Sequence, residues 1–204
     1  VSVTARAQSG TLIYVSNFAD DSVSVYSTNA DGTLTPVTNL AGMGVGPAGT
    51  AVRGDQAFAY VVSNTSQEVR VIDTRTHTVV QTVAGLNLPL GIAVSPDGTR
   101  VYVAEQLFGA NTVSVFAADA TTVTGPDPRA VVFSPDGRRA YVGNQDSGGV
   151  AGSASVSVID TAANTVVASI GVPFELFDIA INPSGTRVYA VHTNGVAVID
   201  TASD

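Results

Sequence analysis

The stretch that decides the fold is AVSPDGTRVYVAEQ, Ala93–Gln106, because it returns twice in the same chain. VFSPDGRRAYVGNQ occupies residues 132–145, and AINPSGTRVYAVHT occupies residues 180–193. Each copy is typical of an apolar strand, a Pro-Asp-Gly or Pro-Ser-Gly turn and a second apolar strand. Two weaker copies precede them, ARAQSGTLIYVSNF at 5–18 and AVRGDQAFAYVVSN at 51–64. Such internal repetition indicates a repeat architecture.

One tyrosine marks each copy, and the tyrosine spacing gives the length of the repeat. The five tyrosines lie 46, 42, 39 and 48 residues apart: Tyr14, Tyr60, Tyr102, Tyr141 and Tyr189. A second segment follows each of them, as in SVSVIDT at 155–161, and its apolar and polar residues alternate with period two. Further β-branched runs such as HTVVQTVAG complete a unit of four strands, named a to d in chain order. Units of four strands that repeat every 40 residues or so predict a β-propeller.

We therefore expect an all-β protein, a single propeller domain over residues 1–204 built from four-stranded antiparallel blades. Its five repeats are bounded at about 1–46, 47–88, 89–126, 127–173 and 174–204. No sequence for strand d follows Gly195–Asp200, so the fifth blade should lack its outer strand and leave an open edge. AADATTVTGPDP leaves room for only a very short strand d in the third blade. Five repeats are compatible with a small five-bladed ring or with a part of a larger propeller.

Composition excludes several classes of function. The chain has 9 basic and 17 acidic residues, a net charge of −8, which repels nucleic acid and anionic lipid. No apolar run approaches the roughly 20 residues of a membrane span, and the first ten residues lack the pattern of a signal peptide. The absence of cysteine excludes disulfides and thiol catalysis. There is no P-loop, GxSxG elbow or HExxH motif.

Two stretches carry a resemblance to known families. IAVSPDGTRVYVAEQ and VSVIDTAANTVVASI resemble the consensus of the YVTN family of β-propeller repeats, in the WD40/YVTN-like superfamily, over nearly the whole chain. The first repeat, TLIYVSNFADDSVSVYSTNADGTLTPV, is similar to the lactonase-type propellers, the 6-phosphogluconolactonase and carboxymuconate cyclase group. The first resemblance implies a secreted or cell-surface binding protein, with the cytoplasm as the alternative location. The second implies a lactonase or cyclase that acts on a small polar substrate, and relatives commonly have seven blades.

The connections between strands differ on the two sides of a blade. The a–b and c–d turns are short and alike, such as SPDG and DTAANT, whereas the b–c and d–a connections are long and varied, such as AEQLFGANT and GVPFELFD. In an antiparallel sheet successive connections alternate between the two ends, so each type lies on one side. Variable loops on a repetitive scaffold usually carry the ligand contacts. We therefore place the functional face on the b–c and d–a side.

Polar side chains concentrate in the loops of that face. The catalytic candidates are Glu105, Arg129, Glu175 and His192. Glu105 or His192 would accept a proton and Arg129 would stabilise an oxyanion. The candidates for ligand binding are Asn17, Asn64, Gln106, Phe108, Asn144, Asp146, Phe177 and Asp178. No cofactor is required, but oxygen-rich side chains suit hard cations, and Ca²⁺ or Mg²⁺ is the cofactor that this set could hold.

The same residues also have structural interpretations. Glu105 and Gln106 could simply end a strand, Arg129 could pair with a nearby aspartate, and His192 stands where Asn17 and Asn144 stand in other repeats. Two hypotheses therefore remain. The first is a propeller that binds a small polar molecule or a protein, with self-association through the open blade edge as a further option. The second is a lactonase-like or cyclase-like enzyme, which needs at least two of the four catalytic candidates in a pocket and within about 4 Å of each other or of one water.

Overall fold

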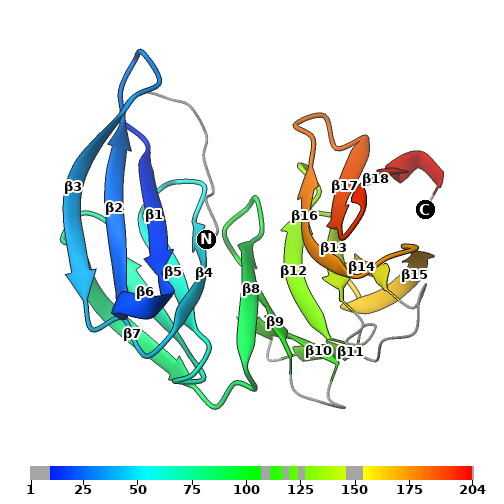
Figure 1. Ribbon diagram of the computed structural model, residues 1–204, viewed down its shortest axis with the longest axis horizontal. Coiled ribbons are helices and arrows are strands. Elements are labelled where there is room, and N and C mark those ends of the chain that lie inside the picture. The colour runs from blue at the N-terminus through cyan, green and yellow to red at the C-terminus, as the bar shows by residue number, and fades with distance from the viewer. Residues whose placement is uncertain (1–9, 107–110, 117–119, 124–126, 146–153, 204) are drawn as a thin grey trace. The chain divides into compact units, whose positions relative to one another are not determined.

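The structure is a computed structural model in which the chain divides into two compact units, residues 1–94 and 95–204 (Figure 1). It describes residues 10–106, 111–116, 120–123, 127–145 and 154–203. These residues form 18 strands in five antiparallel sheets and two short 3-10 helices, Phe18–Asp20 and Thr201–Ser203. None of the described helices is long or apolar enough to span a membrane.

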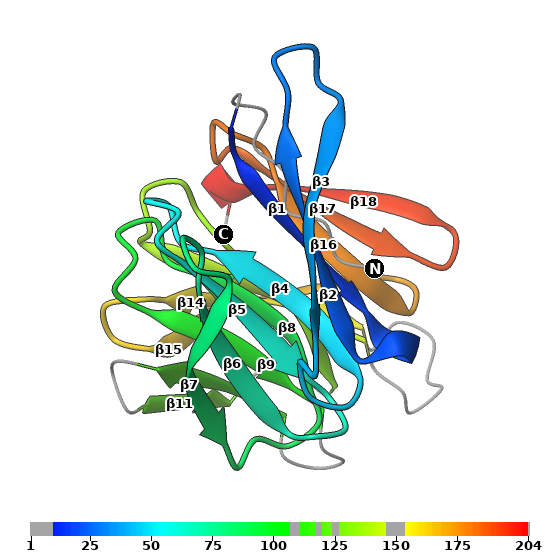
Figure 2. The ribbon, with the colours of Figure 1, turned by 90° about the vertical axis from the view of Figure 1, so that its left-hand side faces the viewer.

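The first unit contains the first two blades and the start of the third. Blade one consists of β1 (Leu12–Asn17), β2 (Ser22–Thr28) and β3 (Leu34–Ala41), paired in that order. Blade two consists of β4 (Pro47–Val52), β5 (Phe58–Ser63), β6 (Glu68–Asp73) and β7 (Thr78–Ala84) (Figure 2). The unit ends with β8 (Pro89–Val94), and β4 lies against both β1 and β8. Residues 1–9, which precede β1 in the first repeat, lie outside the described residues.

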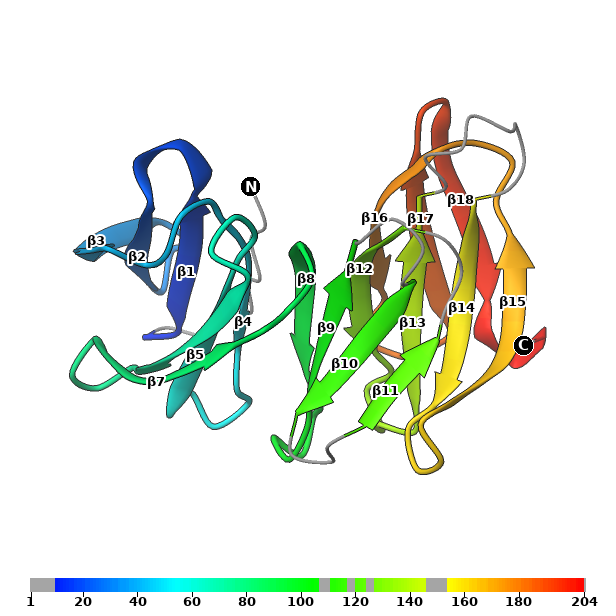
Figure 3. The same cartoon turned by 90° about the horizontal axis from the view of Figure 1, so that it is seen from below.

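The second unit contains the remaining strands (Figure 3). Blade three contributes β9 (Val101–Glu105), β10 (Thr112–Phe116) and β11 (Ala120–Val123). Blade four consists of β12 (Pro128–Phe133), β13 (Arg139–Asn144), β14 (Ser155–Asp160) and β15 (Thr165–Gly171). Blade five consists of β16 (Leu176–Ile181), β17 (Arg187–His192) and β18 (Gly195–Asp200). The all-β propeller with four-stranded antiparallel blades is thereby confirmed. So are the four-residue strand d of blade three and, among the described residues, the missing outer strand of blade five.

Each blade buries one face against its neighbour, and these interfaces form the core. In the first unit Tyr14, Val23 and Val25 of blade one pack with residues of blade two that include Val61 and Ile72. The alternating strand pattern produces this burial because every second side chain of a strand points to the same face. The outer strands β3, β7 and β15 are mostly exposed. Burial of one valine side chain contributes about 2 kcal/mol, so the packing between blades supplies most of the stability.

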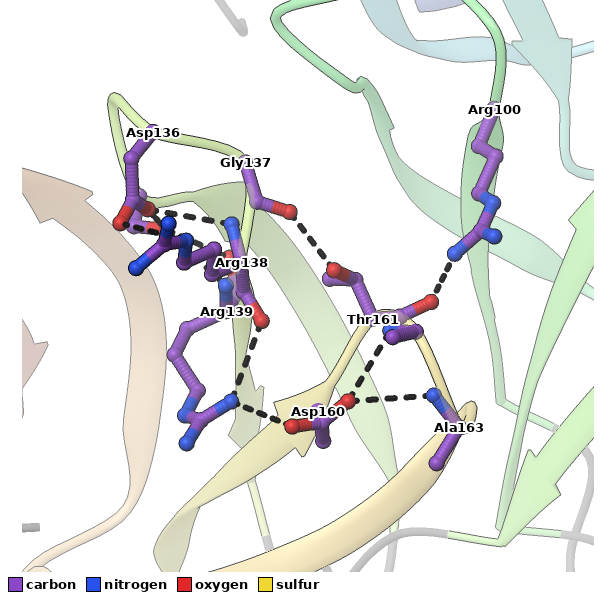
Figure 4. A network of polar contacts seen from close by, with 10 residues as sticks. Arg100, Asp136, Gly137, Arg138, Arg139, Asp160, Thr161 and Ala163 are labelled. Carbon is purple, nitrogen blue, oxygen red and sulfur yellow. Dashed lines mark hydrogen bonds and ion pairs between the residues drawn. The ribbon is translucent and has the colours of Figure 1, made fainter.

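The repeated Asp-Thr pair explains why the a–b and c–d turns are so alike. Thr161 begins the c–d turn of blade four, and its Oγ1 donates to the Gly137 carbonyl in the a–b turn at 2.6 Å (Figure 4). Arg100 of blade three donates to the Thr161 carbonyl. The Asp160 carboxylate accepts the N–H of Ala163 at 3.1 Å, and this bond holds the pKa of Asp160 below its usual value. The Asp-Thr pair therefore holds the a–b and c–d turns together at one end of the blade, which is its scaffold side.

Two of the tyrosines that mark the repeats, Tyr14 and Tyr102, link neighbouring blades on this scaffold side. Tyr102 of blade three donates its hydroxyl to Asn164 Oδ1 in the c–d turn of blade four at 2.6 Å. Tyr14 of blade one makes the equivalent bond with His77 Nδ1 of blade two at 3.3 Å. Asn164 and His77 both have left-handed backbone, with φ of 52° and 54°. Burial, and after it the charge of Asp73, raise the pKa of Tyr14 to about 12.

Alkaline unfolding tests this link. Because the pKa of Tyr14 rises from 10.0 to about 12 on folding, the unfolded chain loses that proton first as the pH rises. The stability that this tyrosine contributes is complete below pH 10 and decreases by about 2 kcal/mol between pH 10 and 12. Tyr14→Phe should remove this pH-dependent part and lower the free energy of unfolding at neutral pH by about 1 kcal/mol. Urea unfolding at a series of pH values measures both effects, and an unchanged alkaline slope would contradict them.

Candidate functional site

The b–c and d–a connections lie together in each unit, on the side where the sequence places the functional face. In the first unit the Gly46 N–H donates to Asp21 Oδ1 at 2.8 Å, which joins a d–a loop to a b–c turn. Asn64 Nδ2 likewise donates to the Pro89 carbonyl at 3.1 Å. In the second unit the Thr193 N–H donates to the Glu175 carbonyl at 3.1 Å. Each blade therefore separates a scaffold end from a loop end.

The last residue of strand b occupies the same register position in every blade. In blade four this residue is Asn144, which is fully buried and whose Nδ2 donates to the hydroxyls of Ser155 and Ser157 at 3.1 and 2.9 Å. In blade one Asn17 donates to Ser22 and Ser24 at 3.0 and 2.9 Å. The asparagine therefore ties strand b to the Ser-Val-Ser start of strand c. Among the described side chains, the buried Asn144 Oδ1 has no hydrogen-bond partner.

Glu105 takes this position in blade three. Its side chain is 2% exposed, and its Oε1 accepts the hydroxyl of Ser114, which corresponds in register to Ser157 of blade four. A carboxylate thus takes the place of the asparagine amide. The serine of blade three donates its hydroxyl to this carboxylate, whereas the serines of blade four accept hydrogen bonds from the amide of Asn144. The contact ties strand b to strand c as the asparagines do.

Substitution of Glu105 separates this structural contact from a chemical role. Glu105→Gln keeps an oxygen that can accept the Ser114 hydroxyl, so the free energy of unfolding should change by less than about 1 kcal/mol. Glu105→Leu leaves Ser114 without this acceptor and should cost about 2 kcal/mol. Thermal and urea unfolding of the two variants give the comparison. An equal loss in both would mean that the charge, and not the hydrogen bond, matters for folding.

A chain of amide and carboxylate groups runs across three blades on the loop side of the second unit. Gln106 Nε2 of blade three donates to Gln145 Oε1 of blade four at 3.1 Å, and Gln145 Nε2 donates to Glu175 Oε1 of blade five. Gln145 is only 9% exposed. We name Gln106, Gln145 and Glu175 the amide chain. It brings together two of the predicted site residues, Gln106 and Glu175, through Gln145, which follows Asn144 on the same loop face.

Arg129 and Phe177 come together because their strands bulge at the same place. The pairing of β12 shifts between Pro128 and Ala130, and that of β16 shifts between Leu176 and Asp178. The extra residue of a bulge is unpaired and turns its side chain in a new direction. The Arg129 guanidinium carbon lies 6.0 Å from the centre of the Phe177 ring, and Phe177 is 44% exposed.

The other candidates of blade five contact their own neighbours. His192 stacks on Phe174 with ring centres 5.2 Å apart, and its Nδ1 accepts the Asn194 N–H at 3.2 Å. The exposed Asp178 accepts the N–H of Ile179 at 2.8 Å.

The contacts described for the four catalytic candidates involve four different partners: Ser114 for Glu105, Phe177 for Arg129, Gln145 for Glu175 and Phe174 for His192. Their assignment to catalysis stays a prediction.

The first unit has a hollow of its own on the loop side. Its volume is about 440 Å³, within the range of ligand pockets. The lining comes from the end of β1, the turn after it and the beginnings of β4 and β8: Ser16, Asn17, Phe18, Ala19, Asp20, Pro47, Ala48 and Leu90. Phe18 is 57% exposed, and Asp20 supplies a carboxylate to the lining. The predicted residue Asn17 lies here.

Two predicted residues and the expected cation receive no further support from the geometry. Phe108 and Asp146 lie outside the described residues. Within the part of the chain that the structure describes, no group of three or more His, Asp or Glu side chains is placed to hold a metal ion. The sequence does contain one indication that Gln145 belongs to the amide chain. A glutamine directly follows the last residue of strand b in both blade three, as Glu105-Gln106, and blade four, as Asn144-Gln145.

Comparisons with known proteins extend this picture. The family model described as "Lactonase, 7-bladed beta-propeller" matches residues 8–154. Kuenenia stuttgartiensis hydrazine synthase is similar in structure, with a TM-score of 0.81 and 26% identity, over 95% of this chain and 60% of that one. A functionally unknown protein from Desulfotomaculum acetoxidans DSM 771 has a TM-score of 0.80 and 20% identity, over 95% and 63%. The chain thus spans about three fifths of both structures. No curated protein matches its sequence.

Proposed function

Because the chain belongs to the lactonase family of seven-bladed β-propellers, we propose that it binds a small polar molecule on the loop side of blades three to five. The observation that carries the proposal is the amide chain, in which Gln106, Gln145 and Glu175 connect three blades. A row of polar groups that all lie at the loop ends of neighbouring blades is suited to one ligand that touches several blades at once.

The chemistry of the amide chain favours a ligand with several hydroxyl groups. A glutamine side chain has two N–H donors and a carbonyl oxygen, and the contacts within the chain use one N–H of each glutamine. A carboxylate accepts but does not donate, so Glu175 suits a hydroxyl of the ligand. Arg129 brings a positive charge to the same side of the same unit, in a protein with a net charge of −8. The combination favours a polyhydroxylated carboxylate or its lactone.

The expected cation fits this proposal only together with the ligand. Ca²⁺ takes six to eight oxygen ligands and Mg²⁺ takes six, which is more than one carboxylate with neighbouring amide oxygens provides. We therefore propose that Ca²⁺ or Mg²⁺ binds through oxygens of the bound carboxylate as well as through Glu175. Calorimetric titration with CaCl₂ should show no binding in buffer and binding in the presence of gluconate. Tight binding of Ca²⁺ alone would contradict this arrangement.

Substitution within the amide chain tests the binding proposal. Gln145→Leu removes both contacts of the middle residue, so the affinity for gluconate should fall at least about tenfold. Gln81→Leu, on the exposed outer strand β7, is the matched control and should leave the affinity unchanged. Calorimetry gives the affinities, and thermal unfolding of both variants shows that each is folded. Equal affinities in the two variants would contradict a ligand at the amide chain.

A second candidate function is lactone hydrolysis at the same face, favoured by the family membership. In that reaction a water oxygen bonds to the lactone carbonyl carbon, the ring C–O bond breaks, and the proton of the water reaches the departing alkoxide. His192 would accept the proton from water and Arg129 would face the oxyanion, whereas Glu105, at 2% exposure, holds the Ser114 hydroxyl. Acid release from glucono-δ-lactone, measured against buffer alone, decides between the candidates. A rate equal to that in buffer leaves the binding function, whereas a faster rate that His192→Gln abolishes supports the enzyme.

Two further proposals concern the location of the protein and a protein partner. We propose an extracellular or cell-surface location, as the resemblance to YVTN propellers implies, with the cytoplasm as the alternative. The loop side could also receive a protein in place of a small molecule, because its connections are long and varied. Fractionation of cells that produce the full-length protein distinguishes the locations.

A further inference from the structure

The hollow of the first unit carries a negative charge in a lining that is largely apolar. Among the described residues that line it, Asp20 is the only one with a charged side chain, and this side chain is exposed. Four others are apolar and small or rigid in shape: Ala19, Pro47, Ala48 and Leu90. The volume of about 440 Å³ suits a small molecule with an apolar body.

The polar side chains of the lining have their hydrogen-bond donors engaged within the protein. Ser16 donates its hydroxyl to the Ala48 carbonyl at 2.5 Å. Asn17 has two side-chain N–H groups, and its Nδ2 donates to the hydroxyls of Ser22 and Ser24. An anionic ligand needs donors or a positive charge, and these side chains supply neither. The lining therefore disfavours a carboxylate or a phosphate and favours a cation.

Phe18 adds an aromatic wall whose edge is held by a neighbouring loop. A Cβ atom at Gly46 would lie 3.0 Å from Cε2 of the Phe18 ring, so the edge of the ring lies against this loop. The loop is held in turn, because the Gly46 N–H donates to Asp21 Oδ1 at 2.8 Å. The Phe18 side chain is nevertheless 57% exposed. An accessible aromatic ring attracts cations through its electron-rich face.

No described basic side chain of the first unit pairs with Asp20. The described part of this unit contains three arginines, and each forms an ion pair with an acidic residue two positions away in the sequence: Arg53 with Asp55, Arg70 with Glu68 and Arg75 with Asp73. None of the three lines the hollow. A positively charged ligand would therefore meet an uncompensated carboxylate, in a protein with a net charge of −8.

We propose that the hollow of the first unit binds a small quaternary ammonium ion. The Phe18 ring contacts the cation, Asp20 balances its charge, and the apolar residues contact its alkyl groups. A primary ammonium has three N–H donors that each require an acceptor, whereas a quaternary ammonium has none. One carboxylate in a largely apolar lining therefore favours the alkylated ion. The hollow belongs to the first unit and the amide chain to the second, so this proposal does not depend on the ligand proposed there.

An NMR titration of the whole chain with choline tests the proposal. We expect the side-chain amide resonances of Asn17 to shift, and those of Gln106 and Gln145 to stay in place. The matched control ligand is the neutral alcohol of the same shape, in which a carbon atom replaces the charged nitrogen, and it should bind at least about threefold more weakly. Gluconate should leave the Asn17 resonances in place, so that the two proposed sites succeed or fail independently.

Two substitutions locate the cation in the hollow. Phe18→Leu keeps an apolar side chain but removes the aromatic face, and Asp20→Asn keeps the shape but removes the charge. Each should weaken choline binding about threefold, and the double variant about tenfold. Asp31→Asn removes the same charge from the exposed turn between β2 and β3, and Phe174→Leu removes an exposed phenylalanine of the second unit. Both controls should leave the affinity unchanged, and urea unfolding shows that all the variants are folded.

Three results would overturn the proposal. Asn17 resonances that stay in place with millimolar choline would show that the hollow does not bind the ion. Equal affinities for choline and for the neutral alcohol would show that the positive charge is not recognised. Equal losses in Asp20→Asn and Asp31→Asn would show that the net charge of the protein, and not the carboxylate in the hollow, attracts the ligand.

Discussion

Gly185→Ala is expected to lower the free energy of unfolding by about 3 kcal/mol, because the position combines a left-handed backbone with a close neighbour. Gly185 lies in the a–b turn of blade five with φ of +73°. A Cβ atom at this position would lie 2.7 Å from Cδ of Pro135 in the turn of blade four, so the turn or the proline must move. The alanine therefore adds a steric conflict between two blades to the cost of the backbone conformation.

Two other glycines separate the cost of the left-handed backbone from the cost of the steric conflict between blades. Gly137 has the same backbone, with φ of +72°, but a Cβ there would lie 3.3 Å from Pro96. Gly32 has φ of +82° and open space around it. The expected losses for alanine are therefore about 2 kcal/mol at Gly137 and about 1 kcal/mol at Gly32. Urea unfolding of the three variants gives the series, and three equal losses would show that the contacts between turns contribute nothing.

Asn144→Leu is expected to cost about 3 kcal/mol, the other large effect. The side chain of Asn144 is fully buried, and its amide satisfies the hydroxyls of Ser155 and Ser157. A leucine would leave both hydroxyls in the interior without this partner, at about 1 to 3 kcal/mol for each group that finds no other. The loss tests whether the asparagine at the end of strand b is a structural tie.

Asn17→Leu is the matched control, because Asn17 makes the same two contacts with serine hydroxyls from a half-buried position. Ser22 is buried there, but Asn17 and Ser24 are half-buried and within reach of water, so the expected loss is only about 1 kcal/mol. The free energies of unfolding of the two variants are compared at the same pH. A larger loss at Asn17 than at Asn144 would mean that burial does not set the value of this contact.

The repeat made much of the fold predictable from the sequence. The recurring tyrosine indicated five sheets, and Tyr102 proves to link one blade to the next. The Asp-Thr pair, which ends strand c in three of the repeats, holds the turns of its own blade together, as Thr161 does. The glycines of the SPDG turns have the left-handed backbone that suits glycine, with φ of 73° at Gly98 and 72° at Gly137. These features could be predicted because each depends on local sequence that returns in several blades.

The arrangement of the candidate site was harder to predict, since it depends on single residues in which the repeats differ. The bulges that bring Arg129 over Phe177 insert one unpaired residue each, and the apolar pattern of their strands does not mark them. Gln145 became the centre of the amide chain because its neighbours come from blades that lie next to it in space but more than 25 residues away in sequence. Glu105, chosen for its divergence, occupies a position that asparagine fills elsewhere.

The most direct test of the proposed function is an NMR titration of the whole chain with gluconate at millimolar concentration. Side-chain amide resonances report on glutamines individually, and the chain offers probes on both sides of the blades. We predict that the side-chain amide resonances of Gln106 and Gln145 shift, and that both shifts give the same dissociation constant for gluconate. The resonances of Gln56, in a scaffold turn, and of Gln81, on the outer strand β7, should not shift. Unmoved resonances of Gln106 and Gln145, or equal shifts of all four, would contradict a polar ligand site at the amide chain.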